Sequence, residues 1–212
     1  MSLTRDLEPP GALTDNGSYP FEFRRVEKQF ETYNGIMVRV RYFILVSIAR
    51  KYGKVSREEE LAVVEAREEP PENPPIRMEV GIEDHLHIEF EFTKSKYHLK
   101  DCIFGKVNFN LVRIKIKVME MNLMKQETLG NGAQAITEKE PVAKFELMDG
   151  APVKGEVVPI RFYLASAQGL TPTYKSINNR VSTRYFLHLV LLDEQDRRYF
   201  KQQEIELWRK QI

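Results

Sequence analysis

Two histidines and two glutamates, spaced two residues apart, are the side chains with the clearest potential for chemistry. His85, His87, Glu89 and Glu91 alternate with apolar residues within a strand predicted over residues 83–92. Alternate residues of a strand share one face at a spacing of about 6.6 Å, so the four side chains could in principle bind zinc. The sequence marks no third or fourth ligand elsewhere. A solvated polar strand face is therefore favoured, and neither a metal nor a cofactor is expected.

Catalytic motifs do not accompany this cluster. The sequence lacks the GxSxG, GxxxxGK[ST], GxGxxG and HExxH signatures of nucleophile, phosphate and zinc sites. Cys102 is the single cysteine, and its apolar neighbours indicate a packed thiol. His98 and His188 are isolated and are interpreted as structural. No catalytic residue is predicted, and the chain is not expected to be an enzyme.

The charge pattern does not favour nucleic acid. Lys and Arg number 32 against 31 Asp and Glu, so a net charge of +1 provides no global field for an anionic polymer. Arg113, Lys115 and Lys117 form a local basic stripe, but no aromatic residues interleave with it. The sequence has no apolar run of about 18 residues, and its first residues do not resemble a signal peptide. A cytoplasmic protein is expected.

Strands must position these residues, because alternation every second residue is the dominant pattern. Residues 107–124 are predicted to form one long strand, with a bulge near Val118 where the apolar phase switches. Turn-forming residues separate the strands, and no helices alternate with them, so the predicted fold class is all-β, built from antiparallel sandwiches. Further strands are predicted at residues 21–23, 36–49, 60–65, 142–147, 157–164, 184–192 and 199–208.

A proline-rich segment divides the chain. Residues 66–75 read AREEPPENPP, in which the prolines remove backbone donors and the glutamates favour hydration. This predicts a hinge at residues 67–75, between a domain of residues 1–66 and one of residues 76–212. The second part is long enough for a complete sandwich, whereas the first is long enough for only part of one. An incomplete sandwich exposes an apolar face and strand edges, so residues 1–65 are expected to pair with another molecule, for example as a homo-oligomer, or to be poorly ordered.

Four blocks of sequence resemble the vacuolar protein sorting 26 family, the arrestin-like small subunit of the retromer coat. The blocks are GALTDNGSYPFEFRRVEKQFETYNGIMVRVRYF (11–43), MEVGIEDHLHIEFEFTKSKYHLKDCIFGK (78–106), FELMDGAPVKGEVVPIRFYLA (145–165) and RYFLHLVLLDEQDRRYFKQQEIELWRK (184–210). The resemblance implies an arrestin-like pair of β-sandwiches, with the N-terminal one incomplete here. It also implies a non-catalytic protein, peripheral on endosomal membranes, that binds an α-solenoid subunit and, with sorting nexins, the cytoplasmic tails of cargo proteins.

The resemblance also implies two binding sites. Leu147 and Met148, in what the resemblance suggests is a loop before Asp149, would anchor the solenoid subunit. Adjacent apolar residues at a strand end would otherwise point one into the core and one into solvent, although both could be buried. Val80 and Phe200 would form an apolar pocket for a cargo side chain beside the first strand after the hinge, where an extended tail adds to the sheet. Ordinary core packing of Phe200 is the alternative.

Two other functions remain open. A paralogous arrestin-like scaffold of another trafficking coat would not bind the solenoid subunit in a pull-down assay. A metal-dependent enzyme that uses His85 and His87 would contain stoichiometric zinc, which is not expected. No interaction with nucleic acid is expected in either case.

Overall fold

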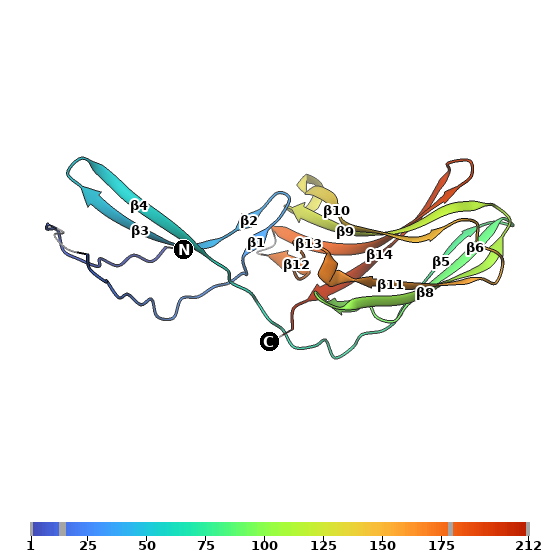
Figure 1. Cartoon of the computed structure of the whole chain (residues 1–212), viewed down its shortest axis with the longest axis horizontal. Helices are drawn as coiled ribbons and strands as arrows, with labels where there is room; N and C mark the ends of the chain where they lie inside the picture. The colour runs from blue at the N-terminus through green and yellow to red at the C-terminus, as the bar shows by residue number, and fades with distance from the viewer. Residues whose placement is uncertain (1, 13–15, 178–179, 211–212) are drawn as a thin grey trace.

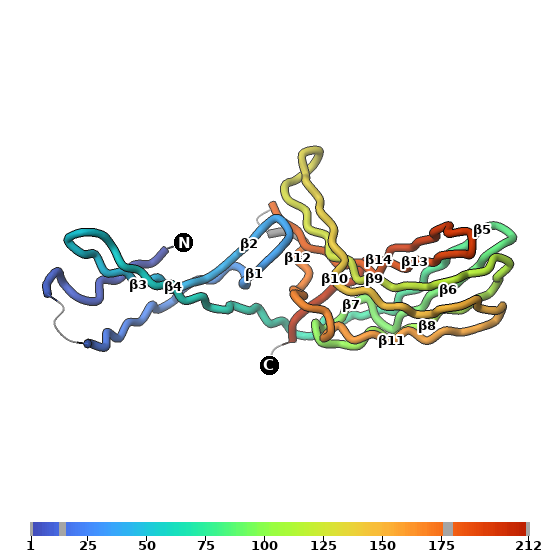
Figure 2. Tube along the Cα trace, turned by 45° about the horizontal axis from the view of Figure 1, so that its top comes forward, coloured from blue at the N-terminus to red at the C-terminus, as the bar shows by residue number. Residues whose placement is uncertain are grey.

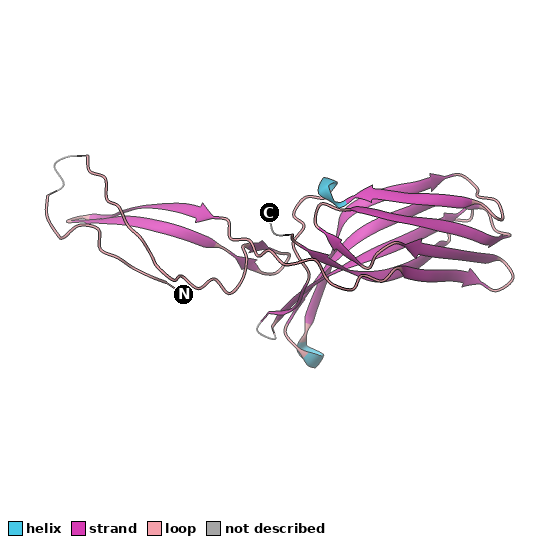
Figure 3. Cartoon of the chain, turned by 90° about the horizontal axis from the view of Figure 1, so that it is seen from below, coloured by secondary structure: helices cyan, strands magenta, loops and turns pink. Residues whose placement is uncertain are grey.

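The regular structure of the chain is almost entirely β. The computed structural model describes residues 2–12, 16–177 and 180–210 (Figure 1). The outer ends of the predicted domains, at residue 1 and residues 211–212, lie outside this part. The described residues contain two single-turn 3-10 helices, η1 (Gly132–Gln134) and η2 (Leu164–Ser166) (Figure 3). The predicted all-β class is confirmed.

The second part of the chain forms a two-layer sandwich. One layer is a four-stranded sheet in the order β11-β8-β6-β5; the other has the order β10-β9-β13-β14-β7, with β12 also paired to β13. Every pair is antiparallel except β14 with β7. The first layer is made of β5 (Ile76–Ile82), β6 (Leu86–Phe92), β8 (Cys102–Val112) and β11 (Val157–Tyr163). The second layer is made of β7 (Lys96–His98), β9 (Ile116–Leu129), β10 (Ile136–Asp149), β12 (Tyr174–Ile177), β13 (Val181–Asp193) and β14 (Arg198–Trp208).

Alternation along the strands produces the core between the layers. In β6, Leu86, Ile88, Phe90 and Phe92 are buried, as the pattern predicts, whereas the intervening residues are partly exposed. The opposite layer contributes further buried residues at alternate positions of β9 and β13. Each large apolar side chain contributes about 1.5–3 kcal/mol when fully buried, so this shared core accounts for most of the favourable folding energy.

The predicted strand over residues 107–124 is two strands. β8 ends at Val112 and β9 begins at Ile116, and the link crosses from one layer to the other. The link, residues 113–115, contains no glycine or proline to mark a turn. The alternating apolar pattern continues through it, so the corner between the two layers could not be predicted from the sequence. The predicted bulge is confirmed: Ile116 pairs with Asp193 and Val118 with Leu192, which leaves Lys117 as the extra residue. Arg113 and Lys115 lie in the corner and Lys117 in the bulge, so the three residues do not form the predicted stripe along one strand.

The N-terminal part contains two separate hairpins. β1 (Tyr33–Asn34) pairs with β2 (Arg39–Val40), and β3 (Tyr42–Arg50) pairs with β4 (Gly53–Leu61). Figures 1 and 2 show β3 and β4 at one end of the molecule, away from the sandwich. The prediction at residues 21–23 was wrong because no strand pairs with this segment, and the one at residues 60–65 was correct only at its start, where β4 ends. The division into two domains at residues 67–75 stays a prediction.

A buried polar cluster joins the β1–β2 hairpin to the sandwich. Tyr33 is only 3% exposed; its hydroxyl hydrogen-bonds to Glu127 Oε1 at 2.7 Å and to Thr183 Oγ1 at 2.9 Å. The backbone N–H of Met37 donates to the other oxygen of the same carboxylate. Burial raises the pKa of Tyr33, so its hydroxyl stays protonated. These bonds satisfy a carboxylate that would be costly to bury alone.

The β3–β4 hairpin should promote self-association. Val46, Ile48 and Val55 share one face and are between 42% and 47% exposed, and Leu45 on the other face is 50% exposed, so both faces of this two-stranded sheet carry uncovered apolar side chains. We expect the chain to form concentration-dependent oligomers in light scattering, and Leu45→Lys to shift the distribution toward monomer. A monomer at all concentrations, with slow amide exchange throughout β3 and β4, would contradict this expectation.

Candidate functional site

The end of β10 presents an unusual apolar pair. Within the part of the chain that the structure describes, β10 is an edge strand that pairs only with β9. Its pairing with β9 shifts between Glu146 and Met148, so Leu147 is an extra residue in a bulge. Bulges re-aim side chains from the regular alternation. Leu147 and Met148 are consequently both partly buried against the sandwich core and both partly exposed.

Two features of this pair differ from the predictions. Leu147 and Met148 lie in a strand rather than a loop, since β10 continues to Asp149 and the turn begins at Gly150. In a regular strand one of the two side chains would point inward and the other outward. The bulge adds Leu147 as an extra residue, so this alternation does not hold for the pair. Each side chain of the pair therefore keeps some apolar surface exposed at the end of an open sheet edge.

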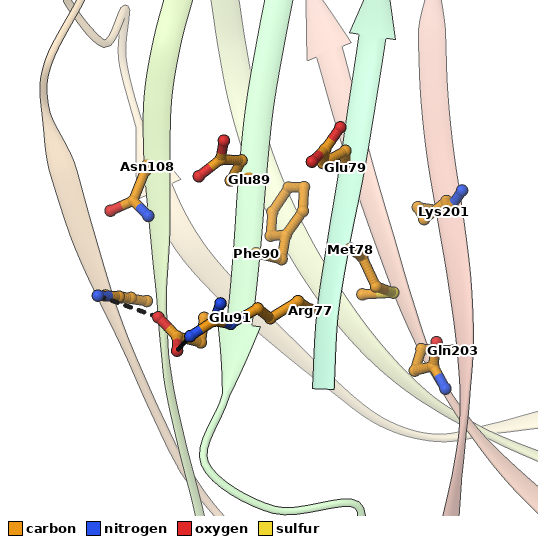
Figure 4. Close-up of a pocket in the computed structure, with 10 residues that line it drawn as sticks. Arg77, Met78, Glu79, Glu89, Phe90, Glu91, Asn108, Lys201 and Gln203 are labelled. Carbon is orange, nitrogen blue, oxygen red and sulfur yellow. Dashed lines mark hydrogen bonds and ion pairs between the residues drawn. The ribbon is translucent and has the colours of Figure 1, made fainter. Parts of the chain in front are cut away.

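A second candidate site lies where the two sheets expose facing edges. Among the described residues, β5 pairs only with β6, and β14 pairs with β7 only over Glu206–Trp208, so the preceding part of β14 has one open edge. A groove of about 740 Å³ runs between these edges (Figure 4). We call it the edge groove. Its lining residues are Arg77, Met78, Glu79, Glu89, Phe90, Glu91, Lys106, Asn108, Lys201 and Gln203.

Neither Val80 nor Phe200 lines the edge groove, and the structure does not bring the two side chains together, because Phe200, opposite Val190, lies on the outer face of the six-stranded sheet. Val80, on β5, is partly buried against the core. Phe200, on β14, is 69% exposed, so the alternative of core packing is wrong. Its ring instead contacts His188 edge to face, with 5.6 Å between ring centroids. Partial burial lowers the pKa of His188, with Lys139 adding to the effect, so this ring is neutral at pH 7 and suits an apolar neighbour.

Charged residues balance one another in part of the groove. Glu91 forms ion pairs with Lys106 at 3.0 Å and with Arg77 at 3.2 Å. The hydrogen bond from Lys106 is the main cause of a lowered pKa for Glu91. The free edge of β5 offers unpaired backbone donors and acceptors on this side, in addition to the side-chain amides of Asn108 and Gln203. A free edge with mixed charges above it can accept an extended segment with alternating side chains.

The predicted face of two histidines and two glutamates is only partly formed. His85 lies in the turn before β6, where its Nδ1 is 2.7 Å from the carbonyl oxygen of Glu83. The remaining three residues lie on β6. The structure brings to them a residue not predicted from the sequence: Glu79 of β5, whose carboxylate is 3.6 Å from His87 Nε2. No local pattern marks it, because its position depends on how β5 and β6 pair.

Asp193 organises the turn that leads into β14 and Phe200. Its carboxylate accepts hydrogen bonds from the backbone N–H groups of Gln195 and Arg197, both at 2.9 Å. Arg197 Nε at 2.7 Å and the Tyr199 hydroxyl at 3.0 Å also donate to it. Burial alone would raise the pKa of Asp193, but these four donors outweigh it and lower the pKa to about 2.

Acid should weaken this turn within a defined range. Because the pKa of Asp193 is about 2 in the folded chain against an ordinary 3.8, its stabilisation is present above pH 3.8 and is lost as pH falls toward 2. We expect Asp193→Asn to lower the melting temperature at pH 5 and the difference from wild type to shrink between pH 4 and pH 2. Asp196→Asn, at an exposed position in the same turn, is the control. A difference that stays constant down to pH 2 would remove Asp193 from this role.

None of the described helices has the length and apolar character needed to span a membrane. Antiparallel sheets packed in two layers, with two further hairpins, place the chain in the class of all-β sandwich proteins.

The chain belongs to the vacuolar protein sorting-associated protein 26 family, whose model matches residues 1–196. It is 56% identical over 208 residues to the Drosophila melanogaster family member, covering 98% of this chain and 43% of that protein. The Caenorhabditis elegans protein is 54% identical over 210 residues, 99% of this chain and 59% of that protein. The Dictyostelium discoideum protein is 53% identical over 212 residues, 100% of this chain and 60% of that protein. The chain thus spans 43% to 60% of these relatives, and the family resemblance of its sequence is confirmed.

Proposed function

We propose that this chain is a non-catalytic retromer subunit, cytoplasmic and peripheral on endosomal membranes. It binds the α-solenoid subunit and, together with a sorting nexin, the cytoplasmic tails of cargo proteins for retrieval to the Golgi or the cell surface. Membership of a protein-sorting family supports this function. The observation that carries it is the bulged apolar pair of Leu147 and Met148 on an open sheet edge.

The pair supports a contact with helices. Two adjacent side chains that are each partly exposed can enter the groove between two helices, while their buried portions keep them in position. A few residues that become fully desolvated at the centre of an interface carry most of its binding energy. Pro141, at the first register shift in β10, discourages pairing of the same edge with another strand because it lacks an N–H donor.

The cargo site follows from the open edge of β5. A tail segment added along β5 would form backbone hydrogen bonds with this strand, and its alternate side chains would face Val80 and the edge groove. Phe200 supplies an exposed aromatic surface on the outer face of β14, where a sorting nexin would contact it. The two partners therefore use different strands, so their sites can be tested separately.

Calorimetric titration of the chain with the α-solenoid subunit tests this function. We expect one solenoid subunit per chain and a dissociation constant in the nanomolar range, about −12 kcal/mol. A cargo-tail peptide added with a sorting nexin should bind the complex without displacing the solenoid. If the folded chain does not bind the solenoid, the alternative of a scaffold for another trafficking coat is favoured.

A further inference from the structure

A compact group of metal-binding side chains lies on the outer face of β5 and β6. One ligand atom from each of Glu79, His87 and Glu89 lies within 4.8 Å of the others. Glu79 and Glu89 are direct partners across the two strands, and Figure 4 shows both carboxylates on the same side of the sheet. His87 Nε2 lies 3.6 Å from Glu79 Oε2. Three ligands from two paired strands are thus held together by the sheet itself.

The charge of this group is unbalanced. Like charges directly opposite each other on a sheet destabilise the pair of strands. Glu91, two residues further along β6, has Lys106 and Arg77 to neutralise it. In the described part of the chain, neither Glu79 nor Glu89 forms an ion pair with a lysine or arginine; the ion pair of Glu79 is with His87. A divalent cation would remove this repulsion.

We propose that Glu79, His87 and Glu89 form a surface site for one Zn²⁺ ion. The ligands would be Nε2 of His87 and one oxygen from each carboxylate, with water in the fourth position. Ligands of tetrahedral zinc, at bonds of about 2.0–2.1 Å, lie about 3.3–3.5 Å apart. The 3.6 Å separation of His87 and Glu79 is already close to this value. Glu89 needs a side-chain movement of about 1 Å, which its partial exposure permits.

The donor set favours zinc over magnesium or calcium. Both of those ions prefer oxygen ligands in larger numbers, six or more, whereas imidazole with carboxylates suits zinc in a smaller shell. This inference does not rest on the proposed function, because all three ligands belong to this chain and need no partner.

Titration of the chain with ZnCl₂ alone, followed by calorimetry and by thermal shift, tests the site. We expect one Zn²⁺ per chain and a melting temperature that rises with zinc but not with MgCl₂. His87→Ala and the double variant Glu79→Gln with Glu89→Gln should each weaken zinc binding by at least about tenfold. His85→Ala is the matched control, because His85 lies in the neighbouring turn with its ring bound to the carbonyl of Glu83.

Several outcomes would overturn the site. Zinc binding unchanged in His87→Ala, or equally weakened in His85→Ala, would place the ion elsewhere. Absence of binding at about 1 mM zinc would also exclude the site. If zinc does not bind but an oligolysine peptide does, and the double glutamine variant loses that peptide, the carboxylates belong to a surface for a basic protein partner. Matching circular dichroism spectra of all variants would exclude misfolding as the cause.

Discussion

Replacing Leu147 with Asp and Met148 with Asn is expected to weaken binding of the α-solenoid subunit by roughly a thousandfold. Each substitution would place a charge or an unpaired amide in a desolvated apolar contact, at a cost of about 2 kcal/mol or more. Together they would move a nanomolar complex into the micromolar range. Calorimetric titration of wild type and the double variant against the solenoid subunit measures this change.

Stability must be measured in parallel, because both side chains also pack partly against the core. If the two residues were in a loop, their replacement would leave stability almost unchanged. Because they lie in β10 and pack on the core, the double variant should lose about 1–3 kcal/mol of unfolding free energy. Ile136→Asp is the matched control: it puts a charge at a 56% exposed apolar position at the other end of the same strand. Unchanged affinity in a folded double variant, or an equal loss in the control, would remove Leu147 and Met148 from the interface.

The variant Phe200→Asp is expected to reduce recruitment of cargo tail with sorting nexin by at least about 30-fold, or ~2 kcal/mol, while solenoid binding survives. A charge in place of the exposed Phe200 ring removes an apolar contact with the partner and must be desolvated when the partner binds. Fluorescence anisotropy of a labelled tail peptide, measured with the sorting nexin present, gives the affinity.

The exposure of Phe200 makes this test interpretable. At 69% exposed, its replacement should alter the unfolding free energy by no more than about 0.5 kcal/mol. Tyr163→Asp is the matched control. Tyr163 is 57% exposed and lies on β11, at the edge of the four-stranded sheet opposite β5 and the proposed cargo site. If Phe200→Asp unfolds the chain, or weakens solenoid binding to the same degree, the cargo-pocket assignment is wrong.

Local alternation was sufficient to predict the strands that supply most of the core. The buried residues of β6 and the extents of β11, β13 and β14 agree with their sequence patterns to within a few residues. In each, one face packs on the core and the other faces outward, so the two-residue period appears in the sequence itself. Short strands escaped prediction because their pairing is remote: β7 has three residues and pairs with residues 206–208.

The candidate sites depended more on pairing between strands than on local sequence. The bulge at Leu147 exists only relative to β9, and Glu79 meets Glu89 only through the register of β5 with β6. One part of the buried junction did have a visible pattern. Lys125 and Glu127 continue the inward phase of Met121 and Leu123 along β9, and polar residues in that phase indicate a buried polar cluster.

The strands of the two layers come from different parts of the chain, and this affects the order in which they are synthesised. The four strands of one layer all precede residue 164, whereas β13 and β14, in the middle of the other layer, come from residues 181–208. At about 5–20 residues per second, the ribosome needs roughly 2 to 9 seconds to add the intervening segment and these strands. At the start of that interval only β7, β9 and β10 of the second layer have been made, so the apolar face of the first layer is covered only in part. A nascent chain stalled before residue 181 should therefore be held by chaperones at the surface that later becomes the core.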